Sequence, residues 1–222
     1  MSRRVQAGLS GIVLAGGKSQ RMGRNKALME LGGKTLISRV LDKLSRLCDE
    51  LIISASEVEK YAHLPARVVP DAIPGRGALS GVHAGLAAMR NERAVVVACD
   101  LPFLSLPLLR YMAAVAFGYD VVVPVVGGYY EPLHAVYGAD CVGQIEQLVT
   151  EGPQRIVALY RRVRVREVTE GEVRLFGAEL SFMNVNTPED WDEAQRLSAR
   201  MLGPLAITGR QTYNEAGFCG SA

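Results

Sequence analysis

Short apolar runs recur along the chain and predict strands that are buried on both faces. The run 94–98 is wholly apolar, and 11–15 follows the same pattern after a leading glycine. Unbroken runs of this kind are typical of parallel strands covered by helices on both sides of a sheet. Further strands are expected at 51–54, 67–69, 120–126, 133–137, 163–166 and 182–185, of which 163–166 alternates strictly and should have one solvated face.

Between these runs, apolar residues recur at helical spacing. In 35–48, Ile37 and Leu41 fall on one face and Arg39 on the other, which predicts an amphipathic helix. Helices are expected at 35–48, 78–89, 106–116, 141–149, 154–159 and 188–201. The last of these has a clear start, because Thr187 suits an N-cap and Pro188 the first turn.

The alternation of strands and helices predicts one α/β domain over residues 8–202. We expect a Rossmann-like three-layer sandwich with a mostly parallel central sheet. In such sheets, ligands bind at the carboxyl ends of the strands. Residues 203–222 show no periodicity, so we expect them to form a loose C-terminal tail.

Composition and charge narrow the function classes. The 222 residues are 49% hydrophobic and carry a net charge of +2, which gives no basis for a nucleic-acid binder. No segment is long and apolar enough to span a bilayer. Cys48, Cys99, Cys141 and Cys219 form neither a CxxC pair nor a zinc pattern, so we expect free thiols in a reducing compartment, the cytoplasm.

The strongest chemical signal is the segment 14–26, which follows the first predicted strand. Gly16 and Gly17 would let backbone N–H groups approach a triphosphate closely. Lys18, Arg21 and Lys26 could then hold the phosphate oxygens. The alternative is a glycine-rich turn without a ligand, which the concentration of cations on one loop disfavours.

Two familiar phosphate motifs are excluded by spacing. Gly17-Lys18-Ser19 resembles the end of a GxxxxGK[ST] loop, but the first glycine would have to stand at position 12, which is Ile12. The dinucleotide motif GxGxxG also fails in this segment.

Two aspartates follow predicted strands. Asp100 ends a buried apolar strand, where a carboxylate is costly unless it is paired or bound to a cation, so we interpret it as a Mg²⁺ ligand. The alternative for Asp100 is a helix cap. Asp71 precedes a loop, where an ordinary Asx turn is the alternative to a contact with a nucleotide.

The segment matches LAGGxSxRMGxxKxL, the signature of small nucleotidyltransferases that activate a phosphorylated partner with a nucleoside triphosphate. The matching positions are Leu14, Ala15, Gly16, Gly17, Ser19, Arg21, Met22, Gly23, Lys26 and Leu28. The Gly-Gly pair resembles the molybdenum cofactor guanylyltransferases of the MobA type. Further similar segments follow in the same order, at 70–71, 75–81, 99–103, 131–137 and 184–188, so the resemblance spans about 10–200.

The resemblance implies a Mg²⁺-dependent transfer of GMP from GTP to the phosphate of molybdenum-bearing molybdopterin, with release of pyrophosphate. The implied catalytic residues are Lys26, Arg21 and Asp100, the last as metal ligand. The implied nucleotide-binding residues are Leu14, Ala15, Gly16, Gly17, Lys18, Lys26, Ser54, Asp71 and Asp100. Asn184 and Asn186, two apart on an expected strand and so on one face, could hydrogen-bond the pterin, as could His134. Turn chemistry for the asparagines and a core position for His134 are the alternatives.

Other functions remain open. Ser54 and Ser56 follow the second strand near the expected base, so a cytidylyltransferase for the same cofactor, or a sugar-phosphate nucleotidyltransferase, is an alternative. A non-catalytic carrier of the cofactor belongs to another class, and such a carrier would not need a triphosphate site with its metal. Molybdoenzymes or cofactor-insertion proteins are expected as partners downstream.

Overall fold

The computed structural model describes residues 8–15, 25–71, 77–152 and 155–202. It contains an eight-stranded sheet in the order β10-β7-β9-β6-β1-β4-β5, with β8 paired to β7. The strands of this sheet are β1 (Leu9–Leu14), β4 (Glu50–Ser54), β5 (Arg67–Val69), β6 (Arg93–Ala98), β7 (Val121–Val126), β8 (Tyr129–Tyr130), β9 (His134–Gly138) and β10 (Val165–Val168). A separate hairpin joins β2 (Glu30–Leu31) and β3 (Lys34–Thr35).

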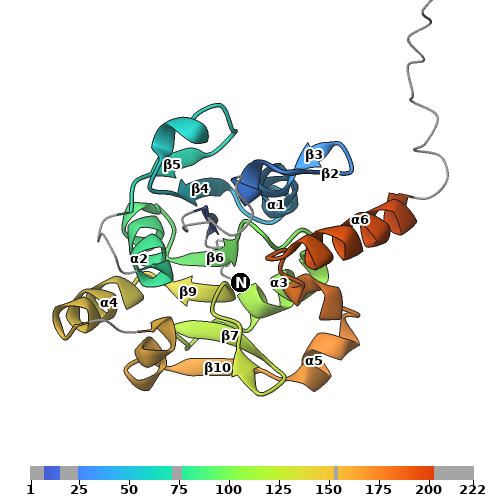
Figure 1. Cartoon of the computed structure of the whole chain (residues 1–222). Helices are drawn as coiled ribbons and strands as arrows, with labels where there is room; N and C mark the ends of the chain where they lie inside the picture. Colours follow the sequence, from blue (N-terminus) through green and yellow to red (C-terminus); the bar gives the residue numbers. More distant parts are fainter. Residues whose placement is uncertain (1–7, 16–24, 72–76, 153–154, 203–222) are drawn as a thin grey trace, which may run out of the picture.

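Helices cover both faces of the sheet, as the alternation of elements predicts (Figure 1). One face carries α1 (Leu36–Leu44), α3 (Leu106–Ala114) and α5 (Glu170–Leu175). The other carries α2 (Ala78–Ala88), α4 (Cys141–Thr150) and the 3₁₀ helix η4 (Ile156–Arg161). The last helix, α6 (Pro188–Leu202), packs beside the β2–β3 hairpin in a small third core. The short 3₁₀ helices η2 (Lys26–Leu28), η3 (Val58–Lys60) and η5 (Glu179–Phe182) complete the described elements.

The predicted three-layer α/β sandwich with a mostly parallel sheet is confirmed. β1 pairs in parallel with β4 and β6, β4 with β5, and β10 with β7, whereas β9 is antiparallel to both β6 and β7. Because β9 reverses direction between them, β7 runs the same way as β6. The carboxyl ends of β1, β4, β5, β6, β7 and β10 therefore meet at one edge, hereafter the carboxyl edge.

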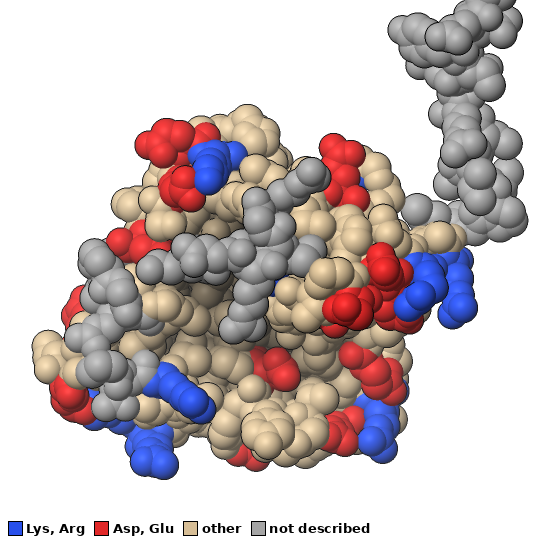
Figure 2. Space-filling view, viewed as in Figure 1, with Lys and Arg blue, Asp and Glu red and all other residues tan. Residues whose placement is uncertain are grey.

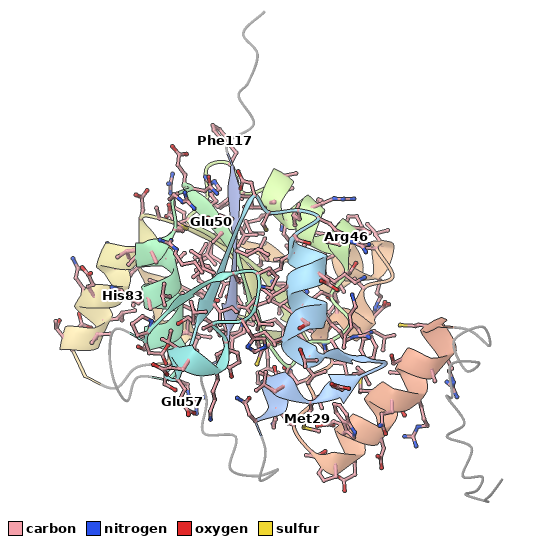
Figure 3. The ribbon with its side chains drawn as sticks, turned by 90° about the horizontal axis from the view of Figure 1, so that it is seen from above. Met29, Arg46, Glu50, Glu57, His83 and Phe117 are labelled. Carbon is pink, nitrogen blue, oxygen red and sulfur yellow. The ribbon has the colours of Figure 1, made fainter. Side chains whose placement is uncertain are left out.

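Figure 3 shows the two ends of the sheet. Glu50, the first residue of β4, lies near Phe117 at one end of the molecule, and Met29 and Glu57 lie at the other. Glu57 follows shortly after β4 has ended, so its end is the carboxyl edge. The loops that follow the parallel strands start from this edge. The described site candidates on these loops therefore lie here as well.

Several predicted elements are wrong in kind or position. The expected strand 182–185 does not form; η5 ends at Phe182 and the next residues extend without a partner strand. The expected helix 154–159 is the 3₁₀ helix η4, and the expected strand 163–166 is β10, which begins two residues later. The short helix α5 and the β2–β3 hairpin were not expected.

Among the described residues, no helix has the length and hydropathy needed to cross a membrane. The described cysteines Cys48, Cys99 and Cys141 are free thiols, as expected. Cys219 and the predicted tail 203–222 lie outside the described residues.

Candidate functional site

One phenol joins the two ends of the predicted phosphate-binding segment. Tyr61 accepts a hydrogen bond from Nδ2 of Asn25 at 3.0 Å and donates to the carbonyl oxygen of Ala15 at 3.3 Å. Ala15 and Asn25 are the described residues on either side of 16–24. Gly16, Gly17, Lys18 and Arg21 lie within that gap, outside the described residues. Tyr61 and Asn25 were not among the predicted site residues, because neither stands at a defining position of a motif.

The end of β1 is tied to the strands on both sides. The carbonyl oxygen of Leu14 accepts from the backbone N–H of Cys99 at 3.1 Å, and the N–H of Ala15 donates to the carbonyl of Ser54 at 2.9 Å. Leu14 and Ala15, both predicted nucleotide-binding residues, therefore start the segment 16–24 from the centre of the carboxyl edge.

Lys26 is held by a residue far away in the sequence. Its side chain is nearly buried, with 8% of the residue exposed, and its Nζ donates to Oδ1 of Asn186 at 2.9 Å. Asn186 is itself fixed, because its backbone N–H and that of Thr187 both donate to Oδ2 of Asp190 at 2.9 Å. Asp190 donates its own N–H to Oγ1 of Thr187 at 3.1 Å, which closes the predicted cap of α6.

The carboxylate of Asp190 has a second effect on this cluster. The two backbone N–H groups, together with the nearby charge on Lys26, hold the pKa of Asp190 below its ordinary value. Asp190 therefore stays ionised while it accepts the backbone N–H groups that hold Asn186 in place. We define Lys26, Asn186, Thr187 and Asp190 as the lysine clamp.

Asp100 lies next to the lysine clamp. It follows β6, it is half-buried, and its carbonyl oxygen accepts from the backbone N–H of Val185 at 3.1 Å. Burial raises the pKa of the Asp100 carboxyl, while the charge on Lys26 pulls it back down. A buried carboxylate with too little positive charge around it is the arrangement that a cation relieves.

The donor set at Asp100 fits magnesium but not a cage made of protein alone. In the described part of the chain, no three histidine, cysteine, aspartate or glutamate side chains gather into a metal site. Mg²⁺ commonly takes one or two carboxylates and completes its octahedron with waters and phosphate oxygens. Asp100 is therefore suited to hold Mg²⁺ as one protein carboxylate, with waters and phosphate oxygens as the remaining ligands.

A second polar corner lies at the ends of β4 and β5. Ser54 has no exposed surface, and its Oγ donates to Oδ1 of Asp71 at 2.8 Å. Gly81 of α2 packs against this pair: a Cβ there would stand 3.1 Å from Leu14 Cδ2 and 3.4 Å from Ser54 Oγ. Ser54 thus orients Asp71, and any contact of this corner with a ligand is made by Asp71.

The predicted pterin residues fall in different environments. Asn186 belongs to the lysine clamp, and Asn184 is exposed, with Nδ2 donating to the carbonyl of Phe182 at 3.4 Å. His134 is completely buried; its Nε2 is hydrogen-bonded to Oγ of Ser181 at 2.6 Å, and its ring packs against Phe182. Burial lowers the pKa of His134 to about 4. His134 therefore supports the site from the core and has no surface that a pterin could touch.

The structure brings together most of the described candidates in two groups. Lys26, Asp100 and Asn186 form one, and Ser54 and Asp71 form the other. Asp190 was not among the predicted site residues; its side chain fixes Asn186 through hydrogen bonds at the start of α6.

Comparison with known proteins agrees with this geometry. The MobA-like NTP transferase domain model matches residues 11–167. A "Probable molybdenum cofactor guanylyltransferase" of Pelotomaculum thermopropionicum is 42% identical over 202 residues, covering 90% of this chain and 96% of the relative. A "Molybdenum cofactor guanylyltransferase" of Desulfosudis oleivorans is 38% identical over 190 residues, covering 84% and 94%.

A solved structure shares the fold along most of the chain. It is the molybdopterin-guanine dinucleotide biosynthesis protein A of Archaeoglobus fulgidus, with a TM-score of 0.76 and 29% identity. The match covers 86% of this chain and 100% of that one.

Proposed function

The chain belongs to the family of MobA-like NTP transferase domains, and on that basis we propose that it transfers GMP from GTP to the phosphate of molybdenum-bearing molybdopterin. An oxygen of the acceptor phosphate attacks the α-phosphorus of GTP. The bond from that phosphorus to the oxygen bridging the α- and β-phosphates breaks, and pyrophosphate leaves. The product is the guanine dinucleotide form of the cofactor.

The observation that carries this proposal is the convergence of Lys26, Asp100 and Asn186 at the carboxyl edge, directly beyond the segment 14–26. The acceptor phosphate is already an anion, so no dedicated general base is needed. Catalysis can then come from positioning the two phosphates and neutralising their charge. Lys26 serves both purposes because the lysine clamp fixes its ammonium.

The remaining nucleotide contacts follow from the sequence signature. Leu14, Ala15, Gly16, Gly17 and Lys18 would line the phosphate path, with Arg21 and Lys18 holding the β- and γ-phosphates. Asp71, oriented by Ser54, would contact the nucleotide near its sugar or the metal. Asn186, through its hold on Lys26, and Asn184 would face the acceptor.

Mg²⁺ is the cofactor we propose, with Asp100 as its protein ligand. Bound there, Mg²⁺ would neutralise charge on the nucleotide phosphates. The raised pKa of Asp100 supports this assignment, because the carboxylate would be stabilised by a cation. The free thiols support a reducing compartment, the cytoplasm, and molybdoenzymes or cofactor-insertion proteins would receive the product.

The preference for guanine over cytosine is the part of the proposal that has the closest alternative. Ser54, one of the two serines that could hydrogen-bond the base, has no exposed surface, so of the two only the exposed Ser56 could touch the base directly. A pyrophosphate-release assay with molybdopterin as acceptor compares GTP with CTP. We expect GTP to be used and CTP to be poor; the reverse order would establish a cytidylyltransferase.

If the protein were a non-catalytic carrier of the cofactor, the same assay would give a different result. The protein would bind molybdopterin tightly and release no pyrophosphate from either nucleotide. The charged cluster of Lys26 and Asp100 opposes this alternative, because burying a lysine and a carboxylate is costly and has no use in a protein that handles no triphosphate.

A further inference from the structure

The segment 183–187, which carries Asn186, has no neighbouring strand to hold it in place. It lies between η5 and α6, and none of its residues pairs with a strand in the described part of the chain. Figure 2 shows acidic and basic side chains gathered over α6, at the right of the view, so the outer face of this helix is solvated. The position of the segment is therefore set from inside the molecule, by a small number of hydrogen bonds.

Two of these bonds act near the end of the segment. The backbone N–H of Val185 donates to the carbonyl oxygen of Asp100 at 3.1 Å, and the backbone N–H of Asn186 donates to Oδ2 of Asp190 at 2.9 Å. Neither bond fixes the start of the segment, where the chain leaves η5.

The start of the segment is held by the buried hydroxyl of Ser181, in η5. Only 1% of Ser181 is exposed, and its Oγ accepts from the backbone N–H of Ser105, the N-cap of α3, at 2.9 Å. The same Oγ lies 2.6 Å from Nε2 of His134, the first residue of β9. Because Oγ accepts from Ser105, its own hydrogen is available to donate to Nε2. Ser181 thus joins η5 to the start of α3 and to the central sheet.

His134 is itself fixed on several sides. It pairs with Val97 of β6, and its backbone N–H donates to the carbonyl oxygen of Glu131 at 3.1 Å. Its ring packs against Phe182, with centroids 4.6 Å apart. Burial lowers the pKa of His134 to about 4, so the ring is neutral and Nε2 can accept the hydrogen of Ser181.

An apolar side chain would fill the position of His134 at a lower cost. Nδ1 of His134 is buried and has no partner among the residues that the structure describes, and an unpaired buried nitrogen costs free energy. A buried polar pair that is kept despite such a cost can specify one arrangement of the elements that it joins. Here those elements are β9, the start of α3 and η5, which together set where the segment 183–187 begins.

We propose that His134 and Ser181 are positioning residues for Lys26. Their bond fixes the start of the segment 183–187, and Asn186 near its end accepts from Nζ of Lys26 at 2.9 Å. A shift at the start of the segment is therefore passed on to the ammonium. The effect on catalysis rests on the proposed function, in which Lys26 acts on the phosphates, and a displacement of about 1 Å there can cost about a hundredfold in rate.

The test compares the loss of the same hydroxyl at the two ends of the sheet. Ser181→Ala removes the proposed anchor, and Ser10→Ala is the matched control. Ser10 has no exposed surface, and its Oγ donates to Oε2 of Glu50 at 2.7 Å, at the end opposite the site. Both variants should lower the Tm to a similar extent, because each leaves buried polar groups unpaired. Only Ser181→Ala should lower kcat, by about tenfold, with the KM for GTP within about twofold of the wild type.

A second pair of variants tests His134 with one amide at two reaches. The glutamine of His134→Gln reaches as far as Nε2 and can accept from Ser181. The asparagine of His134→Asn reaches only as far as Nδ1, which has no partner among the described residues. Both variants bury an amide in place of the ring, so their Tm values should be similar. We expect His134→Gln to keep most of the kcat and His134→Asn to lose about tenfold.

Trp191 gives a readout that does not depend on turnover. It is the single tryptophan of the chain, its backbone N–H donates to the carbonyl oxygen of Thr187 at 3.1 Å, and it packs against the small third core that contains Val185. Its fluorescence therefore reports on the end of the segment. Ser181→Ala should shift the emission to longer wavelength, because a displaced segment lets water reach the indole, and Ser10→Ala should leave it unchanged.

The outcomes separate this inference from the proposed function. If Ser181→Ala and Ser10→Ala lowered the Tm alike and left kcat and the Trp191 emission unchanged, the bond would be structural only and the proposal would be wrong. Equal losses of kcat in His134→Gln and His134→Asn would also overturn it. If the wild type transferred no GMP while the Trp191 emission shifted as expected, the proposed function would fail, and the bond would still position the segment.

Discussion

Nζ of Lys26 lies 2.9 Å from Oδ1 of Asn186, although the two residues are 160 positions apart. The bond joins the start of η2, directly after the glycine-rich segment, to the loop that precedes α6. A buried lysine needs a partner, and here the partner is an amide, which leaves the positive charge unneutralised at that atom. The ammonium thus stays available to a phosphate while its position is fixed.

Asn186→Ala should remove that fixation and lower kcat by about 10- to 100-fold, because a mispositioned catalytic group loses most of its effect. The KM for GTP should change much less, because the loop contacts remain. Steady-state kinetics measures both constants. Arg196→Ala, on the exposed side of α6, is the control and should behave as the wild type. If Arg196→Ala lowered kcat as much as Asn186→Ala, the loss would come from a general disturbance of α6 and not from the bond to Lys26.

Asp190 should act on Lys26 through Asn186. Asp190→Ala removes the acceptor for two backbone N–H groups, so we expect a lower Tm and a kcat reduced by about tenfold. Asp190→Asn keeps an oxygen acceptor and should recover much of the Tm but less of the kcat, because an amide oxygen accepts the two N–H groups more weakly than a carboxylate and holds Asn186 less firmly. Thermal unfolding and turnover are compared on the same samples. If Asp190→Asn restored both the Tm and the kcat fully, the carboxylate charge would have no role.

Tyr61→Phe should loosen both ends of the segment 16–24 without disturbing the acceptor side. The loss of the hydrogen bonds to Asn25 and Ala15 should raise the KM for GTP about fivefold. The KM for molybdopterin should not move. Tyr119→Phe, in the loop before β7, provides a phenol-to-phenyl control far from this segment. An unchanged KM for GTP in Tyr61→Phe would show that the phenol does not position the loop.

Asp100→Asn should abolish Mg²⁺-dependent turnover, with a loss of about a thousandfold or more, because the proposed metal would lose its protein ligand. The fold should be retained or become slightly more stable. Burial raises the pKa of this carboxyl, so the folded protein disfavours its charge and a neutral amide removes that cost. Kinetics over a range of Mg²⁺ concentrations, with Tm as the companion measurement, tests both parts. Substantial residual activity that still depends on Mg²⁺ would refute the assignment.

The loss of folding stability at acid pH should come in part from Glu50, which lies at the end of the sheet opposite the site. Burial alone would raise its pKa, but hydrogen bonds from Arg90 and Ser10 and the charge of Arg67 hold it at about 2. A carboxylate with a lowered pKa stabilises the fold fully above its ordinary value near 4.5. That stabilisation is lost as the pH falls from there towards 2.

Glu50→Gln should therefore cost about 2 kcal/mol of unfolding free energy at pH 7, less than the full pKa change implies because Arg67 and Arg90 remain largely exposed. The difference from the wild type should shrink as the pH is lowered from 5 to 3. Urea unfolding at several pH values measures it. Glu193→Gln, an exposed carboxylate on α6, is the control. A constant difference across this pH range would exclude the proposed origin.

The buried strands and the amphipathic helices could be predicted from the sequence because their residue patterns reflect burial directly. Val95 and Val97 face one core, and Ala94 and Val96 face the other, so β6 had to be apolar throughout. The segment 182–185 was wrongly predicted as a strand for the same reason. Val185 and Met183 pack with Phe103 and α6, and Phe182 packs against the core under α3, so no neighbouring strand covers them. A run of four residues cannot distinguish these two kinds of burial.

Two of the elements that were not expected did carry signals. Gly32 and Gly33 both have positive φ, 60° and 78°, which is the two-glycine turn of a tight hairpin between β2 and β3. Thr169 and Glu172 form a capping box at the start of α5. Both elements are very short, so the apolar periodicity that guides longer predictions was absent.

Residue patterns singled out side chains that are proposed to carry the chemistry themselves, such as Asp100 and Lys26, and the structure brings these two close together. The same patterns did not single out residues whose side chains hold another residue in place. Tyr61 holds Asn25 and Ala15 through hydrogen bonds between segments far apart in the sequence, and such contacts depend on tertiary structure that no local pattern encodes.

The most direct test of the account is to follow the α-phosphate of GTP. The full-length protein is incubated with Mg²⁺, molybdenum-bearing molybdopterin and GTP labelled at the α-phosphate. The pterin product is then isolated, and its mass is determined by mass spectrometry. We predict that the label enters a pterin–guanine dinucleotide in equal amount to the pyrophosphate released, and that Asp100→Asn forms none. Release of pyrophosphate with the label recovered only as free GMP, or transfer from CTP in preference to GTP, would contradict the account.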